Sequence, residues 1–234
     1  SRIPPSNRPG LGRRTPDADP PMREVDLPSS QDEPQGDPLV VPPVAPPAPI
    51  SLGPLSLSHP YCLSPLAGYT NLPFRLVIRE IGGVGLCTTD LVNARSLLEN
   101  NAKARLLTQT RAEDSPLAVQ LFGNSPEHMR DAAALLESRG IATVDVNMGC
   151  PVPKVCKTGG GSAMMADPAS AARLVAGLVR AVRLPVTCKM PLGWDAEHLT
   201  APDLARALDD SRPAGLFMHR RTPTQGFRAR VPLA

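Results

Sequence analysis

The segment from Val144 to Ala163, VDVNMGCPVPKVCKTGGGSA, concentrates residues that could do chemistry. It contains Cys150 and Cys156, the lysines Lys154 and Lys157, and three consecutive glycines. Three kinds of site use such residues: a metal centre, a phosphate-binding loop, and a thiol that takes part in a reaction. A zinc ribbon or a disulfide framework is disfavoured, because the 5 cysteines are widely spaced and form no CxxC pair.

The glycine-rich run Lys157–Ala163 does not form a standard phosphate loop. It matches neither GxxxxGKS nor GxGxxG, the patterns that cradle a phosphate between a strand and a helix. A thiol fits an acid's role better, because its ordinary pKa of about 8.5 keeps it mostly protonated at neutral pH. The residues alone leave two interpretations of Cys150 open: a proton donor, or a small apolar side chain in the core.

The elements that must position this segment alternate between short apolar runs and helical patterns. The clearest helix spans residues 125–140, with Ser125 as its N-cap, Pro126 in its first turn and Gly140 after its end. Further helices are predicted at 70–83, 93–101, 169–182 and 200–210. The six predicted strands lie within residues 61–68, 84–90, 117–123, 143–147, 185–189 and 214–219.

This repeated alternation predicts an α/β fold with a parallel sheet, either an open doubly wound sheet or a (β/α)8 TIM-type barrel. Polar residues favour the barrel, because one follows each predicted strand, as in a site at the carboxyl ends of barrel strands. These residues are Ser64–Pro65, Asp90, Gln120, Asn147, Lys189 and His219. With about six βα units, the barrel is expected to be incomplete.

The first 59 residues differ in composition from the rest of the chain. More than half of the 29 prolines lie in residues 1–60, among charged and small side chains. Such a stretch buries too little apolar area to offset the entropy of ordering it. We therefore predict a disordered Pro-rich tail over 1–59 and a partial barrel domain over 60–234.

The charge and hydropathy of the chain limit its partners only loosely. A net charge of +3 neither requires nor excludes a nucleic acid. No run of 18 apolar residues and no apolar core of a secretory signal occur, so we expect no membrane span and a cytoplasmic protein. A metal ion is not expected either.

Five blocks of the sequence, in order, resemble the tRNA-dihydrouridine synthases, flavin enzymes that reduce uridine in tRNA. Together they cover Leu63 to about Phe227, and the GCPVPKVCKTGGG run is the most specific of them. The resemblance implies a (β/α)8 barrel that holds FMN, followed by a helical tRNA-binding domain. The blocks are LSPLAGYTNLPFR, LAVQLFGNSPE, VDVNMGCPVPKVCKTGGGSAMMADP, VTCKMPLGWD and MHRRTPTQGF.

The resemblance also implies roles for individual residues. Cys150 would be the general acid, giving a proton to C5 of the uracil after hydride transfer from reduced FMN to C6, with NADPH as the usual reductant. For FMN, the resemblance implies backbone contacts from Pro65, Leu66 and Ala67, a hydrogen bond from Gln120 to the ring edge, Lys189 near N1 and O2, and His219 near the ribityl chain or phosphate.

For tRNA, the implied contacts are weaker. Asn93 and Asn147 would lie near the target base, and Lys154, Lys157 and Arg221 near phosphates, with the glycine-rich run as a mobile loop over the substrate. A uridine must leave its folded tRNA to reach such a site, so a deep, partly basic mouth is expected.

The sequence also departs from the family pattern. Pro191 stands where the family usually carries Arg, and Arg220 where a small residue is common. The chain stops after the sixth predicted strand, so we expect a truncated form whose open sheet edges could associate with a partner. Two alternatives follow: an inactive fragment of such an enzyme, or an FMN barrel that reduces a free pyrimidine or a small enone.

Overall fold

The computed structural model describes residues 48–193, 195, 197–220 and 222. Most of the predicted tail, residues 1–47, lies outside the described residues, as does Arg221. The described residues begin at residue 48 and so include part of the segment predicted as tail.

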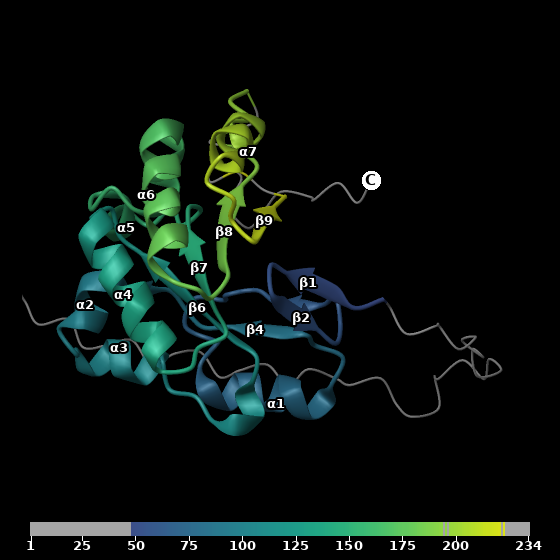
Figure 1. Cartoon of the computed structure of the whole chain (residues 1–234). Helices are drawn as coiled ribbons and strands as arrows, with labels where there is room; N and C mark the ends of the chain where they lie inside the picture. Colours follow the sequence, from purple (N-terminus) through teal and green to yellow (C-terminus); the bar gives the residue numbers. More distant parts are fainter. Residues whose placement is uncertain (1–47, 194, 196, 221, 223–234) are drawn as a thin grey trace, which may run out of the picture. The chain divides into compact units, whose positions relative to one another are not determined.

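A curled sheet of parallel strands forms the centre of the molecule (Figure 1). Its main strands are neighbours in chain order, which is the arrangement of a β/α barrel rather than of a sheet with a switch point. The expected α/β fold with an incomplete barrel of six main strands is therefore confirmed. The path is β3 (Cys62–Leu63), β4 (Leu86–Thr88), β6 (Leu117–Phe122), β7 (Thr143–Asn147), β8 (Val186–Pro191) and β9 (Gly215–His219), and β5 (Val92–Asn93) pairs with β6.

Helices follow the strands and pack side by side, with α2 against α4, α4 against α6, and α6 against α7 (Figure 1). The α3 helix was not predicted from the sequence. The helices are α1 (Leu72–Ile81), α2 (Ala94–Leu98), α3 (Ala102–Leu107), α4 (Pro126–Ser138), α5 (Pro153–Cys156), α6 (Pro168–Ala181) and α7 (Ala201–Asp209), with 3-10 turns at Ala112–Asp114 and Gly161–Ala166.

Side-chain caps set where several of these helices begin. Ser125 accepts the backbone N–H of His128 at 3.2 Å and starts α4, as predicted. Asp167 does the same for α6, accepting from the N–H of Ser170 at 3.0 Å. These caps satisfy N–H groups that the first turn of a helix leaves without partners.

An antiparallel hairpin of β1 (Ile50–Leu52) and β2 (Leu55–Leu57) corrects the prediction that residues 1–59 are a disordered tail. Gly53 turns the chain between the strands with φ +56°. Leu52 and Leu57 are buried, with only 1% of Leu57 exposed. Alternating apolar residues in a short segment are enough for a hairpin once a larger apolar surface lies beneath it.

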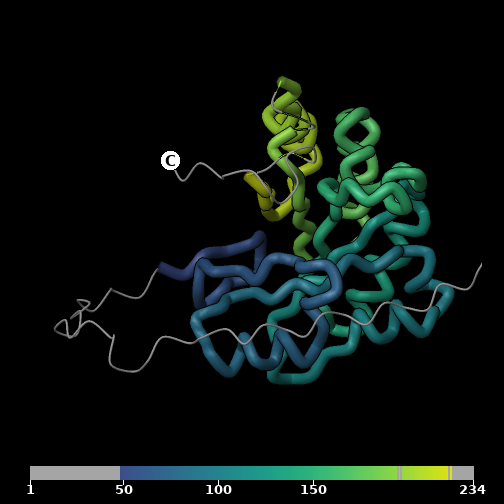
Figure 2. The backbone as a smooth tube through the Cα atoms, turned by 180° about the vertical axis from the view of Figure 1, so that it is seen from behind, coloured from purple at the N-terminus to yellow at the C-terminus, as the bar shows by residue number. Residues whose placement is uncertain are grey.

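That surface lies at the amino-terminal end of the sheet. Leu52 and Leu57 form an apolar cluster with Leu86 and Ala118, which lie at the beginnings of β4 and β6. Cys62 of β3, and Ala214 and Phe217 at β9, pack against the same cluster. The hairpin thus contacts both the first and the last strand of the sheet path, and Figure 2 shows it from behind in purple beside the blue strands.

A buried ion pair fixes α1 to the turn before β6. Arg75 and Asp114 are both fully buried, and Arg75 Nε donates to Asp114 Oδ2 at 2.9 Å. Arg75 also donates to the carbonyl groups of Thr70 and Gln109. A buried guanidinium is tolerated only with partners of this kind. Within the described residues, every helix is too short or too polar for a membrane crossing.

Candidate active site

The strand register places polar side chains in rows across the sheet. Gln120 on β6 is paired with Asp145 on β7, and Asp145 with Thr187 on β8. One step toward the carboxyl ends, Asn147 is paired with Lys189. Because residues two apart in a strand face the same side, these rows form two stacked polar layers on one face of the sheet.

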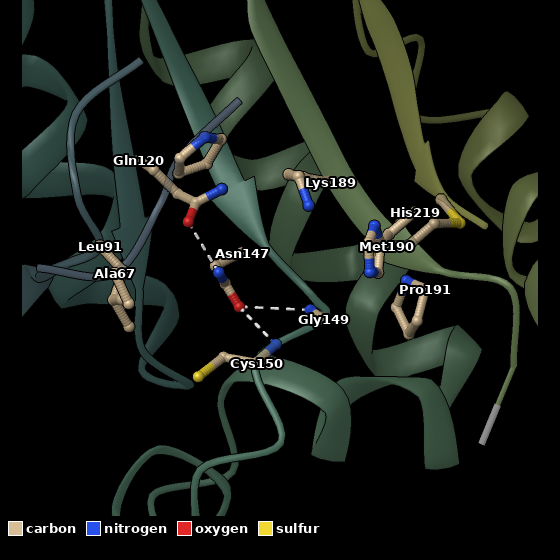
Figure 3. Close-up of a pocket in the computed structure, with 11 residues that line it drawn as sticks. Ala67, Leu91, Gln120, Asn147, Gly149, Cys150, Lys189, Met190, Pro191 and His219 are labelled. Atoms are coloured by element: carbon tan, nitrogen blue, oxygen red, sulfur yellow. Dashed lines mark hydrogen bonds between the residues drawn. The ribbon is translucent and has the colours of Figure 1, made fainter. Parts of the chain in front are cut away.

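Hydrogen bonds join these layers into a chain. Thr187 Oγ1 donates to Asp145 Oδ1 at 2.7 Å, and Gln120 Nε2 donates to Asp145 Oδ2 at 2.6 Å. Asn147 Nδ2 in turn donates to Gln120 Oε1 at 2.7 Å (Figure 3). The carboxylate, the two amides and the hydroxyl are all buried, so this polar network is satisfied within itself.

This series of hydrogen bonds ends at the loop after β7, which contains Cys150 and is called the Cys150 loop below. Asn147 Oδ1 accepts the backbone N–H groups of Gly149 at 3.2 Å and Cys150 at 3.0 Å (Figure 3). The side chain of Asn147, at the end of β7, thereby fixes the turn that carries Cys150.

The environment of the Cys150 thiol keeps its proton in place. Burial raises the pKa of Cys150 above its ordinary value, and the charges of Cys156 and Asp90 act in the same direction. A hydrogen bond from the backbone of Val152 lowers the pKa of Cys150, but this effect is smaller than that of burial. The thiol is therefore suited to give a proton rather than to act as a thiolate nucleophile.

Lys189, at the end of β8, adds a cation on the same face of the sheet as Asn147. Burial lowers the pKa of Lys189, and the nearby Asp145 opposes that shift. Burial raises the pKa of Asp145, while its bonds from Gln120 and Thr187 and the charge of Lys189 act against it. Among the residues the structure describes, the Lys189 ammonium has no hydrogen-bond partner, and in Figure 3 it points into the open space beside Asn147.

A cavity of about 160 Å³ lies at the carboxyl ends of the strands, bounded on one side by Cys150. It brings together residues from all six main strands or the loops that follow them. Its lining residues are Pro65, Ala67, Leu91, Gln120, Asn147, Gly149, Cys150, Lys189, Met190, Pro191 and His219.

A second cavity, of about 550 Å³, lies on the other side of Cys150 and shares Ala67, Leu91 and Cys150 with the first. Its wall comes from α2, α3 and α5 and includes Asn93, Lys154, Lys103, Asp90, Asn101, Phe122, Val152 and Thr158. Asp90 also ties the Ala67 loop to β4, because its Oδ2 accepts the N–H of Gly68 at 2.7 Å. The thiol therefore stands where two cavities meet.

Most of the residues predicted for the cofactor and the reaction are brought together by this arrangement. Cys150, Pro65, Ala67, Gln120, Asn147, Lys189 and His219 line the first cavity, and Asn93 and Lys154 line the second. Two of the predicted residues lie outside both cavities. Leu66 lines neither cavity and is 46% exposed, and Lys157 is exposed outside both.

Asp145 and Thr187 were not among the residues predicted for the site. Both lie inside apolar strands, where they read as ordinary strand residues. The alternation of Asp145 with Asn147 was the available signal, because it places both on one face of β7. Among the described residues, no group of three or more His, Cys, Asp or Glu side chains has the arrangement of a metal site.

The curled parallel sheet, with Cys150 and Lys189 lining a cavity at the carboxyl ends of its strands, defines the protein as an incomplete β/α barrel. The family model for dihydrouridine synthase (Dus) matches residues 62–233, and the chain belongs to that family.

Curated relatives agree with this assignment. The tRNA-dihydrouridine synthase B of Xanthomonas axonopodis pv. citri is 35% identical over 178 residues, which are 76% of this chain and 53% of that protein. The tRNA-dihydrouridine synthase B of Pseudomonas aeruginosa is 35% identical over 173 residues, 74% of this chain and 52% of that protein. The chain thus spans about half the length of these relatives.

Among solved structures, the carboxyl transferase domain of Rhizobium etli pyruvate carboxylase matches 67% of this chain and 26% of its own, with 19% identity and a TM-score of 0.42. This likeness is too weak to carry an inference.

Proposed function

We propose that the protein reduces uridine in tRNA to 5,6-dihydrouridine, with FMN in the first cavity and Cys150 as the general acid. One observation carries the proposal. The Cys150 thiol lies where the first cavity, with its Lys189 cation, meets a second and larger cavity that opens beside it. Such a group can touch a cofactor on one side and a substrate on the other.

The residues of the first cavity fit FMN by their chemistry. The Lys189 ammonium is partly buried and faces the cavity without a hydrogen-bond partner among the described residues, so it can stabilise a reduced, anionic flavin ring. Gln120 Nε2 has a second N–H besides the one given to Asp145. Pro65 and Ala67 offer backbone groups, and His219 also lines the cavity.

When bound and reduced by NADPH, FMN would supply the hydride for C6 of the uracil ring. Cys150 then supplies the proton for C5 from its Sγ, and the thiolate that remains recovers a proton from solvent. Burial raises the pKa of Cys150, so the thiol holds its proton at neutral pH until the ring needs it. Asn147 keeps the loop, and with it the thiol, in place.

The second cavity would receive the extruded uridine. Asn93 lines it with a side-chain amide, although its Oδ1 already accepts the N–H of Ser96 at 2.9 Å. The remaining Asn93 N–H donors are available to a base carbonyl group. Lys154 and Lys103 line the same cavity and would meet phosphates of the neighbouring nucleotides.

The test begins with the visible absorption spectrum of the full chain, with and without added FMN. The proposal expects bound flavin, bleaching by NADPH, and reoxidation by tRNA that contains uridine. Cys150→Ala should keep the flavin and lower the rate of dihydrouridine formation by about 100-fold or more. Cys62→Ala is the matched control, because Cys62 lies at the amino-terminal end of the sheet, and it should leave the rate unchanged.

Two results would contradict the proposal. A chain that stays colourless with excess FMN does not assemble the cofactor site. A chain that binds flavin and reduces a free pyrimidine or an enone, but leaves tRNA unchanged, would be an oxidoreductase of another substrate class.

A further inference from the structure

The network behind the Cys150 loop has a fixed direction. Each amide in it donates toward Asp145 and accepts on the side of Cys150. Reversing either amide would place a donor against a donor, or an acceptor against an acceptor, in a buried site.

Both ends of the network set this direction. At one end, the backbone N–H groups of Gly149 and Cys150 can only donate, so the atom of Asn147 that faces them must be its oxygen. At the other end, both oxygens of Asp145 act as acceptors, Oδ2 from Gln120 Nε2 and Oδ1 from Thr187 Oγ1, so the nitrogen of the Gln120 amide faces the carboxyl group. Gln120 joins the two ends through its own oxygen.

We propose that Asp145 is the positioning residue of the site: it orients the Gln120 and Asn147 amides and, through them, holds the Cys150 loop in its reactive geometry. Asp145 touches neither cavity and is 2% exposed. Its two oxygens are used by Gln120 and Thr187. A carboxylate is costly to bury, and its place in the middle of β7 is explained by this orienting task.

The inference rests on the proposed function only in naming Cys150 as reactive, and its test needs neither flavin nor tRNA. The measurement is amide hydrogen exchange by NMR on the full chain, read at Gly149 and Cys150. The backbone N–H of Met129, buried in α4, serves as the reference for global opening.

Three variants separate positioning from general stability. Asp145→Leu removes both acceptors, so the Gln120 amide loses its partner at this end and is held by Asn147 alone. Protection at Gly149 and Cys150 should fall by about tenfold relative to Met129, as expected for the loss of about 1.4 kcal/mol of hydrogen bonding. Asp145→Asn should restore protection to within about threefold of the natural chain, because its oxygen can face Gln120 while its nitrogen donates to Thr187 Oγ1.

Thr187→Val is the matched control. It removes the bond on the side of Asp145 away from Gln120, so protection at Gly149 and Cys150 should change only as much as at Met129. If Asp145→Leu does not fold, Gln120→Met interrupts the same network one residue further on and should give the same local loss.

The proposal is overturned if Gly149 and Cys150 keep their relative protection in Asp145→Leu or, where that variant does not fold, in Gln120→Met. It is equally overturned if protection falls by the same factor at Met129, because that result would make Asp145 a general stabiliser. The natural chain could bind no flavin and leave tRNA unchanged while Asp145→Leu still shows the local loss of protection. That result would refute only the proposed function and would leave this inference standing.

Discussion

At the scale of single residues, the site contains side chains that the sequence could identify and others that it could not. Gln120, Asn147 and Lys189 follow from their places at predicted strand ends and Cys150 from the GCP block, and the structure brings all four to one cavity. Asp145 could not be predicted, because its role depends on which residue of β6 lies opposite it. That register is a property of the assembled sheet.

The titration of Cys150 tests its assignment as an acid. Burial raises the pKa of this thiol, so it should remain protonated at pH values where a free cysteine has begun to ionise. The rate of iodoacetamide alkylation at Cys150, followed by peptide mass spectrometry, should therefore reach its midpoint above the ordinary value of about 8.5. Cys188, which is fully buried, should not react in the folded chain.

A midpoint at or below the ordinary value would contradict this expectation. A midpoint below about 7 would make Cys150 a thiolate at neutral pH, as a nucleophile is, and would refute the acid's role.

At the scale of elements, the loop between β7 and α6 depends on close backbone approach. Gly161 has φ +60°, and a Cβ there would lie 2.5 Å from the carbonyl oxygen of Cys150. The same carbonyl group accepts the N–H of Ser162 at 3.1 Å and the thiol of Cys156 at 3.3 Å. The glycine-rich run is therefore needed for close packing on the backbone of Cys150. The sequence of the run did not predict this contact.

Gly161→Ala should lower the free energy of unfolding by about 1–3 kcal/mol, because it combines a positive φ with a clash against backbone. Gly177→Ala is the matched control. Gly177 lies within α6, and a Cβ there meets nothing within 4 Å, so this change should raise the free energy of unfolding by about 0.5–1 kcal/mol. Urea unfolding with an unchanged slope measures both, and equal effects would refute the role of the loop.

At the scale of the whole molecule, the alternation of strands and helices predicted the incomplete barrel correctly, because each unit carries its own periodic pattern. The hairpin of β1 and β2 was missed for a physical reason. Proline-rich composition around it indicates disorder, and its four apolar residues are too few to fold alone. Its stability comes from the cluster at the amino-terminal end of the sheet, which local sequence does not contain.

The hairpin should therefore contribute to the stability of the sheet as a whole. Leu57→Ala should lower the free energy of unfolding by about 2–4 kcal/mol, because it leaves a cavity between the hairpin and the sheet. Ser56→Ala, on the exposed side of the same strand, should stay within about 0.5 kcal/mol of the natural chain. Thermal or urea unfolding compares the two, and a Leu57→Ala chain as stable as the control would show that the hairpin is dispensable.

The same hairpin has a consequence for the order in which the protein is made. Leu52 and Leu57 leave the ribosome before every strand they pack on, whereas Ala214 and Phe217, which pack on the same cluster, come after the other five main strands. Until then, part of the apolar face of the hairpin has no partner, and such surfaces are where a nascent chain meets chaperones. The burial of the hairpin strands is thus complete only after β9 has been translated.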